Sequence, residues 1–238
     1  MAGFQQYPGN AYPQGASRAV PGARGAFIRR TYAHLAGAIG LFILIEAALL
    51  NSPIGAKLAG TLLSSSYGWL LVLGGFMVVG WIADKWARSV ESPAMQYLGL
   101  LLYVVAEAII FVPLLYLATE YGGANTIKIA GLLTLTLFAG LTGTVFITGK
   151  DFSFMRGALM LGGFVALGLI VASILFGFSL GLLFSVGMVV LAGGYILYYT
   201  SNVLHHYRTD QHVAAALALF AAVALLFWYL VRIFMSRD

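Results

Sequence analysis

Two acidic residues lie inside long apolar stretches of the sequence, where a carboxylate is costly. They are Glu46 and Glu107, out of eight Asp and Glu residues in the chain. An ionised carboxylate at the centre of a bilayer costs roughly 2.5–3.5 kcal/mol on insertion scales. No Lys or Arg is predicted at the same depth as either acid. Glu107 and Glu46 are therefore candidate proton or cation sites; alternatively, each is a neutral acid hydrogen-bonded to a neighbouring helix.

The position of Glu46 allows a third interpretation. It lies five residues before Asn51, which is about 7.5 Å from the predicted end of its helix. A side chain at that depth could extend toward the membrane surface. Glu107 has no such route, because it lies in the middle of its apolar stretch.

Two other constellations suggest chemistry. Residues 205–212 contain three histidines and Asp210, a set that could bind Zn, Cu or Ni, although the spacing matches no defined site. The alternative is an interfacial helix end followed by a helix that Asp210 caps. Residues 177–181 match the G-x-S-x-G pattern of hydrolases around Ser179, but that motif needs a strand-to-helix turn on a sheet. The predicted topology also places Ser179 and His212 on opposite sides of the membrane, so we expect no catalytic residues and no enzyme.

Composition explains why these residues must be considered in a membrane. Of 238 residues, 61% are hydrophobic and 9% are charged, against about 25% charged in soluble domains. This excludes a soluble enzyme, a disulfide-stapled secreted module and a disordered chain. With no cysteine there is no thiol nucleophile or cysteine metal site, and the chain has no P-loop or dinucleotide fingerprint. We expect a lipid bilayer as the main partner, no cofactor, no metal and no nucleic acid.

The apolar stretches predict an all-α integral membrane protein with seven transmembrane helices. A spanning helix needs about 20 mostly apolar residues, and strands with open edges do not occur in lipid. One proline, Pro113, falls inside a span, where it permits a kink. The seven predicted spans are 31–51, 68–84, 95–118, 127–148, 157–176, 180–204 and 211–234.

Residues 1–26 differ from the rest and predict a disordered tail before a seven-helix domain at 27–238. The tail contains three of the six prolines, five glycines and no acid, so it cannot bury enough apolar surface to fold. If the N-terminus is cytoplasmic, nine of the thirteen Lys and Arg residues fall on the inside and four on the outside. This bias favours a cytoplasmic N-terminus and an outside C-terminus.

Four short segments carry a resemblance to a known family. They are FIRRTY at 27–32, TGKDFSF at 148–154, ILYYTSNVLH at 196–205 and the terminal SRD at 236–238. In this order they resemble segments of the Bax-inhibitor family of seven-helix membrane proteins, in particular its bacterial YccA branch. Glu107 occupies the place of a third-helix Glu found in many bacterial members. The resemblance covers residues 27–238.

The resemblance implies a fold and two functions. The implied fold has two three-helix layers around a central C-terminal helix. Some members are pH-sensitive calcium leaks that use one acid in helix 6 and one in helix 7; the matching positions here are Tyr199 and Ala222, and both lack the acid. The YccA branch is associated with the membrane AAA protease FtsH, as a substrate that also modulates it.

We therefore expect a multi-pass protein of the bacterial cytoplasmic (inner) membrane that modulates FtsH in a stress response and is held by the protease through residues 1–26. The alternative is a pH-sensitive calcium, cation or proton leak that uses Glu107. The two missing acids disfavour the leak, and the acid at Glu107 favours it.

Overall fold

The computed structural model describes residues 21–64, 66–123 and 125–236, and this part of the chain contains helices and no β-strand. Seven of the helices are long and apolar enough to cross a membrane, which confirms the predicted fold class. The elements are α1 (Pro21–Leu50), α2 (Pro53–Leu63), α3 (Ser66–Ala87), α4 (Pro93–Tyr121), α5 (Thr126–Thr148), the 3₁₀ turn η2 (Ser153–Met155), α6 (Arg156–Phe176), α7 (Gly181–His205) and α8 (His212–Met235).

The first helix begins earlier than the sequence predicted. α1 starts at Pro21, so residues 21–26 of the predicted tail are helical, and the residues before them lie outside the described part of the chain. Proline suits the first turn of a helix, where its missing N–H would have no partner anyway.

The sequence analysis missed α2, which has 11 residues and is too short to span a bilayer. Its start is nevertheless encoded locally. The Ser52 hydroxyl accepts a hydrogen bond from the Gly55 backbone N–H at 3.3 Å, and Pro53 follows at the first helical position. Serine before proline is a strong helix-start signal.

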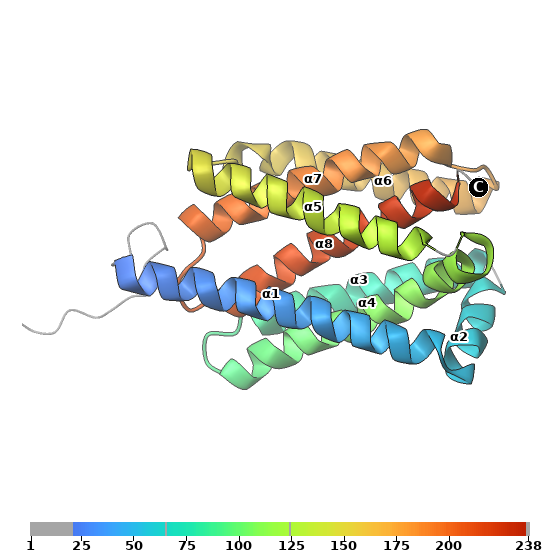
Figure 1. Cartoon of the computed structure of the whole chain (residues 1–238), viewed down its shortest axis with the longest axis horizontal. Helices are drawn as coiled ribbons and strands as arrows, with labels where there is room; N and C mark the ends of the chain where they lie inside the picture. The colour runs from blue at the N-terminus through green and yellow to red at the C-terminus, as the bar shows by residue number, and fades with distance from the viewer. Residues whose placement is uncertain (1–20, 65, 124, 237–238) are drawn as a thin grey trace, which may run out of the picture.

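The seven long helices form two layers with one helix between them (Figure 1). Helices α1, α3 and α4 pack together on one side, and α5, α6 and α7 pack together on the other. α8 lies between the layers and contacts α1, α3, α4, α5 and α7. The predicted arrangement of two three-helix layers around a central helix is therefore confirmed.

The composition of α8 fits its central place. Fifteen of its residues are buried, and six of these are alanines, which let neighbouring helices approach closely. Larger side chains fill the remaining space: Phe220 is 2% exposed and packs edge-on against Phe42 of α1 at 6.0 Å and Tyr103 of α4 at 6.1 Å. A helix that is apolar on all sides is expected to be surrounded by others.

The outer helices present apolar side chains outward. Leu71, Ile147 and Leu183 are 80%, 87% and 86% exposed, and they lie on α3, α5 and α7. A soluble protein rarely exposes so much contiguous apolar surface. This surface is the one that contacts lipid, so the chain is a membrane protein.

The bundle has two ends, which we name by their connections (Figure 1). At the proximal end α1 begins and the α3–α4, α5–α6 and α7–α8 connections lie. At the distal end lie α2, the α4–α5 and α6–α7 connections and the end of α8. Among the described Lys and Arg residues, eight lie at the proximal end and three at the distal end. The eight are Arg24, Arg29, Arg30, Lys85, Arg88, Lys150, Arg156 and Arg208, and the three are Lys57, Lys128 and Arg232.

Candidate functional site

Glu107 is at the midpoint of α4, fourteen residues or about 21 Å from each end of the helix. Its side chain is 7% exposed, and its Oε2 atom has no hydrogen-bond partner among the described residues. The structure therefore places an uncompensated carboxyl group in the middle of the bundle. Buried polar atoms normally have partners, so an orphaned oxygen at this depth keeps Glu107 as a candidate proton or cation site.

The carboxyl group of Glu107 lines a cavity of about 380 Å³ between α3, α4, α6 and α8, which we call the Glu107 cavity. Six of its sixteen lining residues are aromatic. Trp228 stacks on Trp69 at 6.5 Å and meets Phe111 edge-on at 4.9 Å. Aromatic faces attract cations, and a carboxylate adds a full negative charge. The cavity therefore combines features that suit a cation or a transferable proton.

The distal side of the Glu107 cavity carries a positive charge. Arg232, near the end of α8, lines the cavity and lies over the ring of Tyr229 at 5.9 Å. Ser173 and Ser179 add hydroxyl groups from α6 and the α6–α7 connection. A fixed guanidinium at this side disfavours free entry of cations from the distal end.

Glu46 is separate from this cavity. It is 4% exposed, neither of its carboxylate oxygens has a hydrogen-bond partner, and it lies four residues before the end of α1. The interpretation that its side chain reaches the membrane surface is therefore wrong. Glu46 and Glu107 are both buried acids, but Glu46 does not line the cavity that Glu107 faces.

The two positions where the resemblance implies acids lie in different surroundings. Tyr199 lines a cavity of about 820 Å³ at the proximal end, which we call the proximal cavity. Ala222 is 3% exposed in the core around α8. Near Tyr199 the carboxylate of Asp84 is engaged by the Nε atom of Arg88 at 2.8 and 2.9 Å. A carboxylate pair at Tyr199 and Ala222 is therefore absent.

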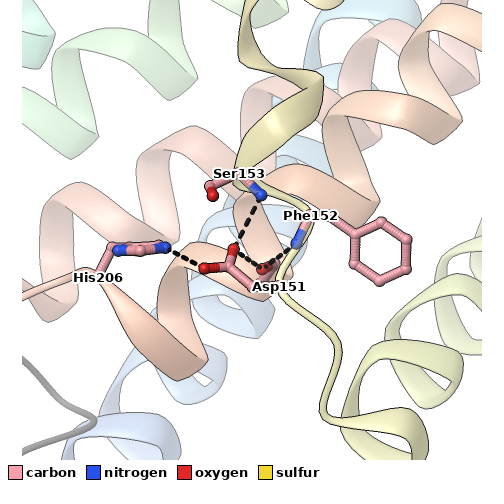
Figure 2. A network of polar contacts seen from close by, with 5 residues as sticks. Asp151, Phe152, Ser153 and His206 are labelled. Carbon is pink, nitrogen blue, oxygen red and sulfur yellow. Dashed lines mark hydrogen bonds and ion pairs between the residues drawn. The ribbon is translucent and has the colours of Figure 1, made fainter.

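The α5–α6 connection is held to the end of α7 by a polar network that the sequence analysis missed (Figure 2). The Oδ2 atom of Asp151 lies 2.8 Å from Nε2 of His206, and Oδ1 accepts hydrogen bonds from the Ser153 backbone N–H at 2.9 Å and the Ser201 hydroxyl at 3.2 Å. The Ser201 oxygen in turn accepts the Phe152 backbone N–H at 2.8 Å. We call these residues the Asp151 latch.

The electrostatics of the latch follow from these contacts. Partial burial alone raises the pKa of Asp151, but the hydrogen bonds from Ser153 and the interaction with His206 outweigh it and lower the pKa to about 2. Asp151 is therefore charged at neutral pH. Asp151 lies in segment 148–154 and Ser201 in segment 196–205, two of the segments that carry the family resemblance, and His206 directly follows the second. Asp151 and His206 are 55 positions apart in the sequence.

The histidine-rich segment does not assemble as one site. His206 contacts Asp151, whereas His212 packs against His34 of α1 with ring centroids 5.0 Å apart. Asp210 binds Arg208 at 2.5 Å, and the residue that precedes α8 is Gln211, whose side chain makes no capping bond. The expectation that Asp210 caps the helix is therefore wrong. Within the described residues no group of three His, Asp or Glu side chains could hold a metal ion.

The hydrolase-like motif is not assembled either. Ser179 lies in the α6–α7 connection at the distal end, whereas Asp210 and His212 lie at the proximal end. The separation corresponds to the full length of α7, 25 residues or about 37 Å. Ser179 instead lines the Glu107 cavity.

Comparison with known proteins gives a consistent set of relatives. Residues 24–238 match the sequence model of the family described as inhibitor of apoptosis-promoting Bax1. The chain is 29% identical over 204 residues to the modulator of FtsH protease YccA of Escherichia coli K12. The aligned residues cover 83% of this chain and 89% of that protein. It is 28% identical to a BI1-like protein of Arabidopsis thaliana, over 98% of this chain and 86% of the relative. A Pseudomonas aeruginosa protein is 36% identical over 121 residues. These cover 50% of this chain and 54% of that relative's length.

Proposed function

This chain belongs to the Bax-inhibitor family, and from that premise we propose that it modulates, and is itself a substrate of, an FtsH-type AAA protease in a bacterial inner membrane during stress. The observation that carries this proposal is its similarity to YccA, a protein named as a modulator of FtsH, across 83% of the chain. The same relative in a second Escherichia coli strain is named an inner membrane protein. No catalytic group is needed for this role.

The packing of α1 supports a way in which such a protein could occupy the protease. The segment that precedes α1, predicted to be disordered, would be the part that the protease grips. Pulling on it would next have to remove α1 from α4 and α8, which it contacts along its length. Phe42 of α1 is held between Phe111 at 5.0 Å and Phe220 at 6.0 Å. A helix anchored in this manner resists extraction and stalls the protease.

The orientation that this role requires places the proximal end in the cytoplasm. The described basic residues gather at that end, as the positive-inside rule requires of a cytoplasmic face. Because the chain has no cysteine, single cysteines give clean labelling. A membrane-impermeant maleimide added to intact spheroplasts should label Lys57→Cys and spare Lys150→Cys; the reverse pattern would overturn the orientation.

Degradation in FtsH-containing membranes tests the function. The half-life of the intact chain is compared with that of a chain lacking residues 2–20 and with one in which those residues are scrambled. We expect the deletion to be degraded several-fold more slowly and the scrambled chain to behave like the intact one, since a handle needs no fixed sequence. Equal half-lives for the intact and deleted chains would overturn the proposal.

A second candidate function is a calcium, cation or proton leak, favoured by the orphaned oxygen of Glu107 in its aromatic cavity. Flux into proteoliposomes between pH 5 and 8 tests it. Glu107→Gln should abolish the flux, whereas Glu120→Gln, an exposed acid near the end of the same helix, should not. Absence of flux above empty liposomes from folded protein would exclude the leak and leave the protease role.

A further inference from the structure

The proximal cavity is a hollow of about 820 Å³ whose walls come from five parts of the fold. Arg88 follows α3, Ser153 lies in η2, and Arg156 and Met160 belong to the first turns of α6. The remaining wall is α7 with the α7–α8 connection. Near the distal end, α3 and α6 come together and both line the Glu107 cavity. At the proximal end they line a much larger space.

The charged residues that line the proximal cavity are basic. They are Arg88 and Arg156; the imidazole of His206 also lines the cavity, and among the described residues no Asp or Glu does so. The nearby carboxylates are already engaged, since Asp84 binds Arg88 and Asp151 binds His206. The Arg156 side chain makes no hydrogen bond or ion pair within the described residues. The cavity therefore carries an uncompensated positive charge.

Neutral donors surround this charge. The side chains of Asn202 and Tyr198 line the cavity, and neither makes a hydrogen bond within the described residues. An amide and a phenol both donate to anionic oxygens. Together with Arg156, which can donate two parallel hydrogen bonds, these groups form a set of donors suited to a phosphate.

Part of the lining of the proximal cavity is apolar. Leu159 and Met160 of α6 line it, and the Tyr195 hydroxyl is bound to the Leu159 carbonyl oxygen at 2.9 Å, which leaves the ring as an apolar wall. Tyr195 is eleven residues, or about 16 Å, from His206 along the chain of α7. Met160 is 58% exposed on the surface that faces lipid. The lining thus combines hydrogen-bond donors with apolar side chains, one of which, Met160, is exposed on the outer surface of α6.

We propose that the proximal cavity binds a phosphate ester, with the phosphate held by Arg156, Asn202 and Tyr198 and the attached group lying along α6. Two sources carry this chemistry: the headgroup of an anionic phospholipid and a soluble phosphate ester. The lateral apolar contact at Met160 favours the lipid. This site is independent of the protease role and of Glu107, which lines a different cavity near the distal end.

Binding to the full-length purified protein tests the site. Native mass spectrometry counts bound dioleoyl phosphatidylglycerol in one arm, and in the other arm sn-glycerol 1-phosphate competes at matched ionic strength. We expect Arg156→Gln to weaken lipid binding about 10-fold, the ratio that corresponds to ~1.4 kcal/mol for one lost charge-assisted interaction. Tyr198→Phe should weaken it by a smaller factor, because it removes a neutral donor.

Lys150→Gln is the matched control, since Lys150 is an exposed basic residue at the same end that does not line the cavity. It should change binding less than 2-fold. If glycerol phosphate does not displace the bound lipid, the site is assigned to a lipid headgroup. If glycerol phosphate displaces the lipid, the site is assigned to a soluble ester. Equal loss in Arg156→Gln and Lys150→Gln, or retention of lipid by a folded Arg156→Gln protein, would overturn the proposal.

Discussion

Replacing Asp151 by Asn should destabilise the bundle at neutral pH, because it removes the charge at the centre of the Asp151 latch while keeping the shape of the side chain. A pKa of about 2, against an ordinary value of 3.8, would correspond to about 2.4 kcal/mol for a fully buried group. The Asp151 side chain is 42% exposed, so solvent screening reduces the expected loss to about 1 kcal/mol.

The stability that Asp151 contributes depends on pH. A carboxyl group whose pKa is lowered by folding stabilises the protein above its unfolded pKa, and this contribution is lost as pH falls through the folded pKa. For Asp151 that window runs from about pH 4 down to about pH 2. The difference between wild type and Asp151→Asn should be complete at pH 5 and fall to about half at pH 3.

Thermal unfolding in nanodiscs, followed by tryptophan fluorescence, measures the effect. A loss of about 1 kcal/mol lowers Tm by about 2–4 °C for a chain of this size. Glu91→Gln is the control, because Glu91 is an exposed acid in the α3–α4 connection at the same end. If Asp151→Asn and Glu91→Gln unfold at the same temperature at pH 7, or if their difference does not shrink at pH 3, the latch does not act as argued.

Three further substitutions test the packing and the latch. Gly99→Ala should cost about 1–3 kcal/mol by chemical denaturation, because its Cβ would lie 2.5 Å from a backbone oxygen of α3, whereas Gly75→Ala, with open space, should cost nothing measurable. Phe111→Ala should cost about 3–5 kcal/mol and lower Tm strongly, since the ring is 1% exposed and packs against three other aromatic rings; a neutral result would refute the packing around α8. Ser201→Ala should lower the free energy of unfolding by about 1 kcal/mol. In a double-mutant cycle, Ser201→Ala combined with Asp151→Asn should lower it by less than the sum of the two single losses. Full additivity would mean that the two side chains act separately.

The spans could be predicted because each depends on one local property, a long apolar stretch. The predicted limits 95–118 and 127–148 differ from α4 and α5 by at most three residues at any end. A search for long apolar stretches could not find the short helix α2, since eleven residues cannot cross a bilayer. Ser52 and Pro53 nevertheless mark its start. A search for helix caps as well as hydropathy would have found it.

The candidate site could be predicted only in part. Glu107 was identified because burying an acid is costly wherever it occurs, but its aromatic cavity depends on which faces of α3, α4, α6 and α8 meet. The contact between Asp151 and His206 joins residues 55 positions apart, and nothing local to either residue encodes it. The sequence analysis grouped Asp210 with the three histidines, whereas in the structure Asp210 binds Arg208 and His206 contacts Asp151.

The central position of α8 has a consequence for how the protein is made. Translation delivers α1 to α7 to the membrane before α8, so six spans must wait as two layers whose facing surfaces have no protein between them. Lipid chains fill that space until α8 enters and displaces them. Assembly of the core is thus tied to completion of the seventh span, because the buried residues of α8 contact both layers.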